Sequence, residues 1–447
     1  MSKKIILFLS DRKTGPRAVR QTYSCPDGSQ AAGIQTNEAP VRYLLAAHPG
    51  VKEVLCVATP VGRETLPEME RIVREAAPAA AVTGIPFEEG EDFSAGPLAA
   101  IMGRVHKGDE ILLELTGGLR DAVMQLLLAS RALSYSGIPT AGAVYANYSA
   151  REIVDCSRLI GLFDLVGGMQ ELASFGSVKA LWAYYAGAAE PEVRSLLEAM
   201  EALHEDITLC RTRKLEERIA AFNAAMEGAE GCADPLLRAL LPAFHDKFGK
   251  KLNVPGLIRW CVGSDMLQQA LTIYRERIPG YILGDRKDEL IAPVPREQMR
   301  PGAADWYDQM MQEKRDYETE EELLFRRSLL NLGGMLSRQY PDRDSAVLTL
   351  EHLEELAERS DYFAVHCSTG QLRDILMDYQ YIRMLRNMVN HANEQGSEDQ
   401  RQLMDLLAGH GYRRLEEVGA QDIRNALEKG LADLKSRPKK SPKSKKR

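Results

Sequence analysis

The sequence predicts an α/β Rossmann-like domain followed by an all-α region, and two observations carry this prediction. In the first 150 residues, short and nearly continuous apolar runs alternate with helical stretches. This alternation is typical of a parallel sheet covered by helices on both faces. From about residue 160 onward, helical periodicity dominates the sequence. We therefore expect an α/β domain over residues 1–155 and a helical region over residues 156–435.

The front half is expected to form a doubly wound sheet. Its five apolar runs predict buried strands at 4–10, 53–59, 80–86, 110–115 and 141–148. Its helical stretches predict helices at 38–47, 67–76 and 119–134. In sheets of this kind, ligands bind beyond the carboxyl ends of the strands. Residues that directly follow these strands are therefore the first candidates for a binding site.

The back half is expected to be helical, with two exceptions. Its periodic segments lie at 192–204, 215–227, 235–247, 319–336, 349–358, 371–393 and 420–435. Residues 253–306 are richer in proline and glycine and predict a less regular insertion. Residues 436–447 are rich in lysine and arginine, with proline and serine, and predict a disordered basic tail. This tail could bind RNA, or it could only increase the solubility of the chain.

Composition narrows the class of protein. No apolar run reaches the length of about 18 residues that a membrane span needs, and the apolar stretch at 5–9 is too short for a signal peptide. The seven cysteines are scattered and never form C-x-x-C, which disfavours disulfides and structural zinc and indicates a cytoplasmic protein. No histidine or carboxylate pattern typical of a metal site occurs. With a net charge of −7, nucleic-acid binding would need local basic patches.

The most informative loop of the front half lies between a predicted strand and a predicted helix. It contains Thr116, Gly117, Gly118 and Arg120. Two glycines let a backbone approach a ligand closely, and a threonine can cap a helix. Free amides at a helix N-terminus and a forked arginine attract anions. The loop therefore suits a phosphodiester, although a plain strand-to-helix turn would use the same residues.

These residues resemble the ligand-binding motif of CARF domains, which sense cyclic oligoadenylates. The T-G-G-x-R stretch follows a buried strand as it does there, and Gly33–Ala39 (GIQTNEA) is similar to a Q-T-N-E-A stretch of the DxTHG subgroup. Glu114 replaces the aspartate of that motif and Gly117 its histidine. The resemblance implies a cyclic oligoadenylate site formed by Ser10, Gln35, Thr36, Asn37, Thr116, Gly117, Gly118 and Arg120.

The back half contains an arginine–histidine pair that resembles the R-x(4–6)-H motif of HEPN ribonucleases. Four pairs have a permitted spacing: Arg42/His48, Arg238/His245, Arg359/His366 and Arg386/His391. Only the last lies in a long amphipathic segment near the C-terminus and has a polar residue, Asn387, after its arginine. The resemblance implies that Arg386, Asn387 and His391 are catalytic. An exposed arginine and a helix-end histidine would leave the same pattern.

The chemistry of metal-independent RNA cleavage explains these residue types. A histidine can move protons near neutral pH, and an arginine can neutralise the charge that develops on phosphate. Asn387 and His391 are four residues apart and share one face of a helix. Arg386 lies about 140° of helical rotation from His391. One helix therefore aims the pair poorly at a single atom, and we expect a homodimer to complete the cleft.

Together, the two resemblances indicate a CARF–HEPN ancillary ribonuclease of type III CRISPR antiviral defence, of the Csm/Csx type. They imply an endoribonuclease that cyclic oligoadenylate activates and that cuts single-stranded RNA without a metal or another cofactor. The alternatives are a non-catalytic CARF-type nucleotide sensor or regulator, and a HEPN toxin acting on transfer RNA. A magnesium-dependent nuclease fused to the CARF domain would need a carboxylate cluster that the back half lacks. Ring size, degradation of the activator and base preference stay open.

Overall fold

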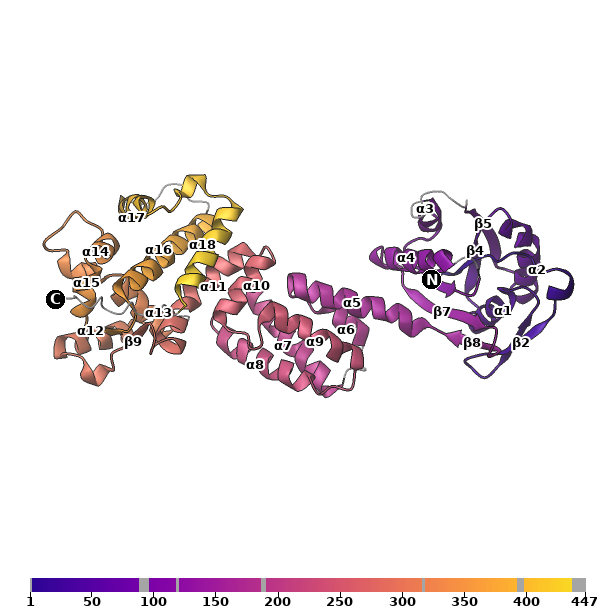
Figure 1. The fold of residues 1–447 in the computed structure, drawn as a ribbon, viewed down its shortest axis with the longest axis horizontal. Helices are drawn as coiled ribbons and strands as arrows, with labels where there is room; N and C mark the ends of the chain where they lie inside the picture. Colours follow the sequence, from indigo (N-terminus) through magenta and orange to yellow (C-terminus); the bar gives the residue numbers. More distant parts are fainter. Residues whose placement is uncertain are drawn as a thin grey trace, which may run out of the picture. The chain divides into compact units, whose positions relative to one another are not determined.

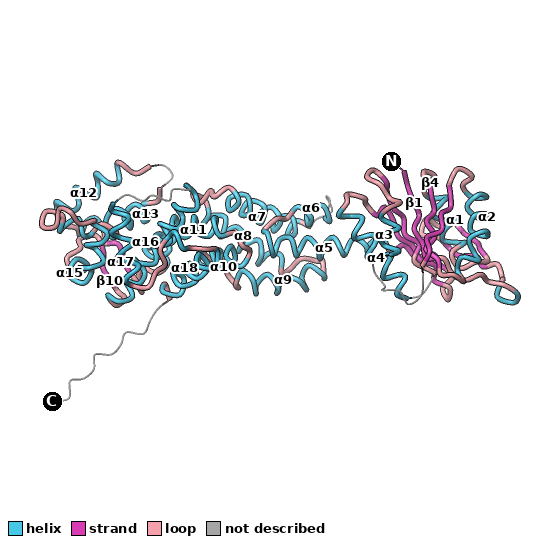
Figure 2. Tube along the Cα trace, turned by 90° about the horizontal axis from the view of Figure 1, so that it is seen from above, coloured by secondary structure: helices cyan, strands magenta, loops and turns pink. Residues whose placement is uncertain are grey.

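The chain divides into two compact units, Met1–Gly168 and Met169–Arg447. The computed structural model describes residues 2–87, 96–117, 120–185, 190–315, 318–391 and 398–435. The first unit is built on an eight-stranded sheet with helices, and the second is helical (Figures 1 and 2). The predicted fold class is therefore confirmed. The strand β8 ends at Asp155, where the domain boundary was expected, whereas the compact units divide within the following helix α5, Ser157–Phe175.

The sheet of the first unit has the order β3-β2-β8-β7-β6-β1-β4-β5. Five consecutive strands, from β7 to the edge strand β5, run parallel and correspond to the five predicted ones: β1 (Ser2–Phe8), β4 (Val51–Ala58), β5 (Ala81–Pro86), β6 (Asp109–Glu114) and β7 (Thr140–Asn147). Three short strands were not predicted: β2 (Gln21–Ser24), β3 (Gln30–Gly33) and β8 (Glu152–Asp155). They extend the sheet beyond β7.

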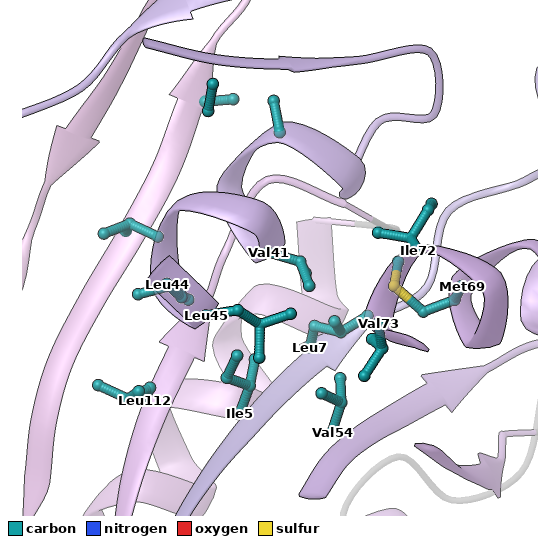
Figure 3. Close-up of a cluster of buried hydrophobic side chains, with 14 of the residues drawn as sticks. Ile5, Leu7, Val41, Leu44, Leu45, Val54, Met69, Ile72, Val73 and Leu112 are labelled. Atoms are coloured by element: carbon teal, nitrogen blue, oxygen red, sulfur yellow. The ribbon is translucent and has the colours of Figure 1, made fainter. Parts of the chain in front are cut away.

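Helices cover both faces of this sheet. They are α1 (Glu38–Ala47), α2 (Leu66–Ala76), α3 (Gly96–Met102) and α4 (Arg120–Tyr135). Because side chains alternate along a strand, Ile5 and Leu7 of β1 pack with α1 and α2 (Figure 3), whereas Ile6 and Phe8 pack in the cluster that contains α3 and α4. Burial on both faces explains why these strands are continuous apolar runs.

The order of the parallel strands reverses its direction at β1. The chain proceeds from β1 to β4 and β5 on one side, and then crosses to β6 and β7 on the other. In open α/β sheets, the ligand-binding crevice lies at the carboxyl ends of the strands where this reversal occurs. The loops after β1 and β6 are therefore the natural walls of a site.

The second unit consists of helices that follow α5. They are α6 (Lys179–Tyr185), α7 (Pro191–Thr208), α8 (Leu215–Ala229), α9 (Pro235–Phe248), α10 (Val254–Gly263), α11 (Leu267–Gly280), α12 (Pro301–Gln312), α13 (Glu320–Leu324), α14 (Ser345–Glu351), α15 (Leu353–Glu358), α16 (Thr369–His391), α17 (Glu398–Gly409) and α18 (Ala420–Asp433). The long helix α16 packs against α11 and α18. These three helices form the frame for the predicted catalytic residues.

The segment 253–306 differs from the expected irregular insertion, because it contains α10 and α11. Pro255 lies in the first turn of α10, where its missing N–H costs nothing, and Pro279 lies at the end of α11. Both helices are largely buried. A short antiparallel ribbon of β9 (Ile291–Pro293) and β10 (Phe363–Val365) is the exception to an all-helical unit in the described residues. The basic tail at 436–447 lies outside them.

Candidate functional site

Most of the predicted ligand-binding residues lie at the carboxyl edge of the sheet. Ser10 follows β1, Asn37 precedes α1, and Thr116 and Gly117 follow β6. Thr36 is half-buried beside Asn37. Gly118 lies outside the described residues, and Arg120 begins α4 with a side chain that also lies outside them. The structure therefore brings the loops of three separate sequence motifs to one edge.

A fully buried carboxylate, Glu114, holds this edge together. It accepts hydrogen bonds from Asn37 Nδ2 and, at 2.8 Å, from the Thr116 backbone N–H. Burial raises the pKa of Glu114 to about 7, although these hydrogen bonds oppose the shift. The sequence motif contains Glu114, but its role as the centre of a buried polar cluster became visible only with the fold.

Asn37 joins three segments of the chain through one carboxamide group. Its Nδ2 donates to the Phe8 carbonyl at 3.1 Å as well as to Glu114, and its Oδ1 accepts from the Ser10 N–H at 3.0 Å. The ends of β1 and β6 are thus fixed to the start of α1. Because Asn37 is buried, it positions the binding loops from within.

Gly117 has no room for a side chain. A β-carbon there would lie less than 3.0 Å from Asn37 Nδ2, the Phe8 carbonyl oxygen and Ser10 Oγ. The neighbouring Thr116 hydroxyl accepts a hydrogen bond at 2.7 Å from the Ala146 N–H of β7. These two residues therefore lock the loop onto β1 and β7. The histidine that the resembling motif has at this position would not fit here.

Gln35 supports a neighbouring loop. Its carboxamide accepts from the Lys13 N–H at 2.8 Å and donates to the Lys13 carbonyl at 3.3 Å. The side chain of Gln35 is buried, so its contribution in this structure is to hold the loop after β1. This loop, residues 11–20, carries the exposed arginines Arg12, Arg17 and Arg20. The sequence signal for it was a short basic run directly after a strand, which was not among the predicted site residues.

Comparisons with known proteins show a likeness to solved structures but no match by sequence. No protein-family profile matches the sequence, and a search of curated proteins finds no match. Among solved structures, the chain is similar to Enterococcus italicus Csm6 bound to cyclic hexa-2′-fluoro-hexa-dAMP. The sequence identity is 12% and the TM-score 0.37, and the likeness covers 97% of this chain and 94% of that chain.

The four arginine–histidine pairs differ in their structural settings. Arg386, Asn387 and His391 all lie on α16, which is one unbroken helix of 23 residues ending at His391. Arg42 of the first pair is already held by Glu38 and Glu75. Arg359 and His366 lie on either side of β10, so they share no helix. The side chain of His391 lies outside the described residues.

Arg386 is largely buried against α11. Its Nη2 lies 3.7 Å from Glu276 Oε1, and Glu276 also accepts a hydrogen bond from Thr212. Desolvation lowers the pKa of Arg386 and the nearby Arg275 lowers it further, whereas Glu276 opposes both. Its buried Nε has no hydrogen-bond partner. A buried donor without an acceptor is costly, so the fold leaves one polar group of this guanidinium unsatisfied.

Asn390 repeats this feature one helical turn later. It follows Arg386 by four residues, so the two side chains lie on the same face of α16. Its Oδ1 is buried and has no hydrogen-bond partner. Sequence analysis did not select Asn390. One face of α16 therefore carries a hydrogen-bond donor, Arg386 Nε, and an acceptor, Asn390 Oδ1, that are both buried without a partner.

A buried polar cluster fixes α16 against α18. Asp378 of α16 accepts hydrogen bonds from the Tyr412 hydroxyl at 2.7 Å and from Lys429 Nζ at 2.6 Å. Lys429, on α18, also binds Asp433 at 3.1 Å. Burial raises the pKa of Asp378 to about 7, and its hydrogen bond with Asp433 acts in the same direction, against Lys429 and Tyr412. The cluster holds the helix that carries Arg386 in place.

Within the described ranges, no group of three or more histidine, cysteine, aspartate or glutamate side chains could hold a metal ion. Within the same part of the chain, every helix is too short or too polar to cross a bilayer.

Proposed function

We propose that this chain is a cytoplasmic, cyclic-oligoadenylate-activated endoribonuclease of the CARF–HEPN kind, acting in type III CRISPR defence. The observation that carries the proposal is Arg386: a largely buried guanidinium with an unpaired Nε, five residues before His391 on one continuous helix. The cluster around Glu114 in the first unit supports a sensor for the activator.

The first unit would bind the ring at the carboxyl edge of the sheet. The loops after β1 and β6 are fixed by Asn37 and Glu114 before any ligand arrives. A preformed site loses little conformational entropy on binding. The residues toward the ligand would be Ser10, Thr36, Thr116 to Gly118 and Arg120, with Gln35 and Asn37 supporting them from within. An anion is favoured by the basic loop at 11–20.

The second unit would cut RNA by using the substrate's own 2′-hydroxyl group. The 2′ oxygen forms a bond to the adjacent phosphorus while the bond from phosphorus to the 5′ oxygen breaks, which gives a 2′,3′-cyclic phosphate and a 5′-hydroxyl end. His391 would take the proton from the nucleophile or supply one to the leaving oxygen. Arg386 would stabilise the charge on the phosphate, and Asn387 would orient His391. This reaction uses no metal.

A homodimer would complete both sites. On the first unit, Met124, Leu128 and Tyr135 of α4 form an exposed stripe, and Leu159, Phe163 and Val166 of α5 form a second one. The two helices are adjacent, because Arg131 of α4 pairs with Asp164 of α5 at 2.7 Å. Exposed apolar surface of this kind is typical of an interaction site. Since α4 begins at the binding loop, a second copy on this face would bring two such loops together.

The test is an RNA cleavage assay with the full-length chain in EDTA. Labelled single-stranded RNA is incubated with cyclic tetra- or hexa-adenylate in parallel, beside His391→Ala. We expect one ring to activate cleavage and the variant to lose at least about 100-fold of the rate, as loss of a general acid–base group does. His410→Ala, which removes an exposed histidine of the same unit, should cut normally.

Two outcomes would contradict the proposal. If neither ring changes the cleavage rate, the sensor role fails. If His391→Ala cuts as fast as the unchanged chain, the catalytic assignment fails. Ring binding without any cleavage would favour the non-catalytic sensor instead, and cleavage of transfer RNA without a ring would favour a toxin.

A further inference from the structure

An exposed tyrosine lies in the turn that follows β7, at the same edge of the sheet as the Glu114 cluster. Tyr148 is 57% exposed and belongs to the tight connection between β7 and β8. Two cationic groups surround its ring: Arg151 Cζ lies 4.5 Å and Lys13 Nζ 5.7 Å from the ring centroid. An aromatic ring on this surface is therefore flanked by two positive charges from two different loops.

Among the residues that the structure describes, no carboxylate pairs with either cation, Lys13 or Arg151. Within these residues, Arg151 Nη1 is buried without a hydrogen-bond partner. Arg151 also has a φ of 57°, a left-handed conformation that a non-glycine residue adopts at a cost of roughly 1 kcal/mol. An anionic ligand would supply the missing acceptor for this arginine.

Hydrogen bonds connect both the β7–β8 turn and the loop that carries Lys13 to the edge of the sheet that contains Thr116. The Ala146 N–H, two residues before Tyr148, donates to the Thr116 hydroxyl at 2.7 Å. The buried Gln35 holds the Lys13 backbone through both its N–H and its carbonyl. The Ser24 N–H donates to the Arg151 carbonyl at 2.9 Å, which fixes the turn from β2. The three side chains are therefore held by the same framework as the Thr116–Gly117 loop.

We propose that Tyr148, Lys13 and Arg151 form a nucleotide subsite, in which the aromatic ring stacks on one adenine base and the two cations bind the neighbouring phosphodiester. Bases stack on aromatic side chains and on arginine planes, and unpaired cations beside the ring match the phosphate of the same nucleotide. This inference rests on the proposed function, because it assigns one unit of the cyclic oligoadenylate to residues outside the resembling motifs.

The subsite can be tested by equilibrium binding of fluorescent cyclic tetra- and hexa-adenylate to the full-length chain. We expect Tyr148→Leu and Arg151→Gln each to weaken binding of the preferred ring about tenfold, equivalent to about 1.4 kcal/mol. Tyr148→Phe keeps the ring and should bind within about twofold of the unchanged chain. Arg71→Gln serves as the control, since Arg71 is an exposed arginine of the same unit that is already paired with Glu68 and Glu75.

The outcomes separate the subsite from the function on which it rests. If the unchanged chain binds a ring and Tyr148→Leu binds it equally well, the subsite is wrong and the proposed function stands. If the unchanged chain binds neither ring, the proposed function is wrong, and the subsite, which depends on it, is wrong as well. A linear hexa-adenylate provides the third arm: equal affinity for it, with equal loss in Tyr148→Leu, would overturn the ring in favour of an RNA strand.

Discussion

The two candidate sites differ in how far the protein satisfies its own polar groups. At the edge of the sheet, Glu114, Asn37 and Thr116 bind one another and the backbone of neighbouring strands. On α16, Arg386 Nε and Asn390 Oδ1 are buried and have no partners. A site whose framework is satisfied can receive a ligand without rearranging, whereas unpaired groups require something else to complete them. The framework of the proposed sensor is therefore satisfied within one copy of the chain, whereas the proposed catalytic cleft on α16 needs further groups to complete it.

Separating the two copies of the proposed homodimer should affect RNA cleavage more than any other change. Leu128→Glu places a charge in the apolar stripe of α4, and we expect the dimer dissociation constant to rise at least about 100-fold, or about 3 kcal/mol. RNA cleavage should fall with it, because the cleft on α16 would lose its second half. Light scattering and the cleavage assay measure both effects.

Val61→Glu is the matched control for this experiment. Val61 is an exposed apolar residue of the same unit, in the loop between β4 and α2. If Leu128→Glu leaves the molecular mass unchanged, or if a monomer cuts RNA normally, the cleft is complete in one copy.

The rigidity of the sensor can be tested at Gly117. Because a β-carbon would meet Asn37, the Phe8 carbonyl and Ser10, Gly117→Ala should destabilise the first unit by about 1–3 kcal/mol and weaken ring binding. Chemical denaturation and ring titration measure these effects. Gly50→Ala is the control, since no atom lies within 4 Å of a β-carbon there. Equal stability of the two variants would show that the loop is loose.

Each unit contains a buried carboxyl group whose protonation makes the stability of the fold depend on pH. Burial raises the pKa of Glu114 and of Asp378 to about 7, from ordinary values of 4.5 and 3.8. The folded state therefore holds protons that the unfolded state releases, so each group makes the fold less stable as pH rises from about 4 to 7. Each should contribute roughly 3–4 kcal/mol over this range.

Thermal unfolding of single variants assigns this pH dependence. Glu114→Gln and Asp378→Asn should each flatten the change in melting temperature between about pH 5 and pH 7.5, and the double variant should flatten it most. Stability that rises through this range, or variants with the slope of the unchanged chain, would contradict the raised pKa values.

The smallest expected effect concerns the partner of Arg386. Glu276 lies 3.7 Å away and opposes the repulsion from Arg275, so Glu276→Gln should lower the cleavage rate by up to about fivefold, or about 1 kcal/mol. Ring binding should not change. Glu355→Gln removes one partner of the exposed pair with Arg359 and is the control. A loss as large as that of His391→Ala would mean that Glu276 takes part directly.

The sequence predicted most of the buried strands of the first unit correctly, but it did not predict the short strands at the edge of the sheet. The strands β1, β4, β6 and β7 are visible in the sequence because burial on both faces demands continuous apolar runs, and the edge strand β5 is also marked by an apolar run although it is mostly exposed or half-buried. The strands β2, β3 and β8 are short and partly exposed, so no such pattern marks them. The helices α10 and α11 were missed because proline suggested irregular structure, although Pro255 lies where a helix tolerates it.

The site shows the same division. Motif spacing identified Thr116 and Gly117 in the first unit and the helix that carries Arg386 in the second. Within each of these two motifs, the residues are close together in the sequence. Lys13, Tyr148 and Arg151 become neighbours only through strand order, since β1 and the β7–β8 turn are far apart along the chain. Unpaired buried atoms, such as Asn390 Oδ1, depend on the environment of each side chain and cannot be read from spacing alone.

The helix α4 gives the binding loop a long reach. It starts three residues after Gly117 and continues for 16 residues to the exposed Tyr135, a length of about 24 Å at 1.5 Å per residue. A rigid rod of that length turns a small angle into a large displacement: a tilt of about 5° at the loop moves the far end by about 2 Å. The helix α4 therefore acts as a lever arm: a small rearrangement around one phosphate at its first residue would displace its far end, at Tyr135.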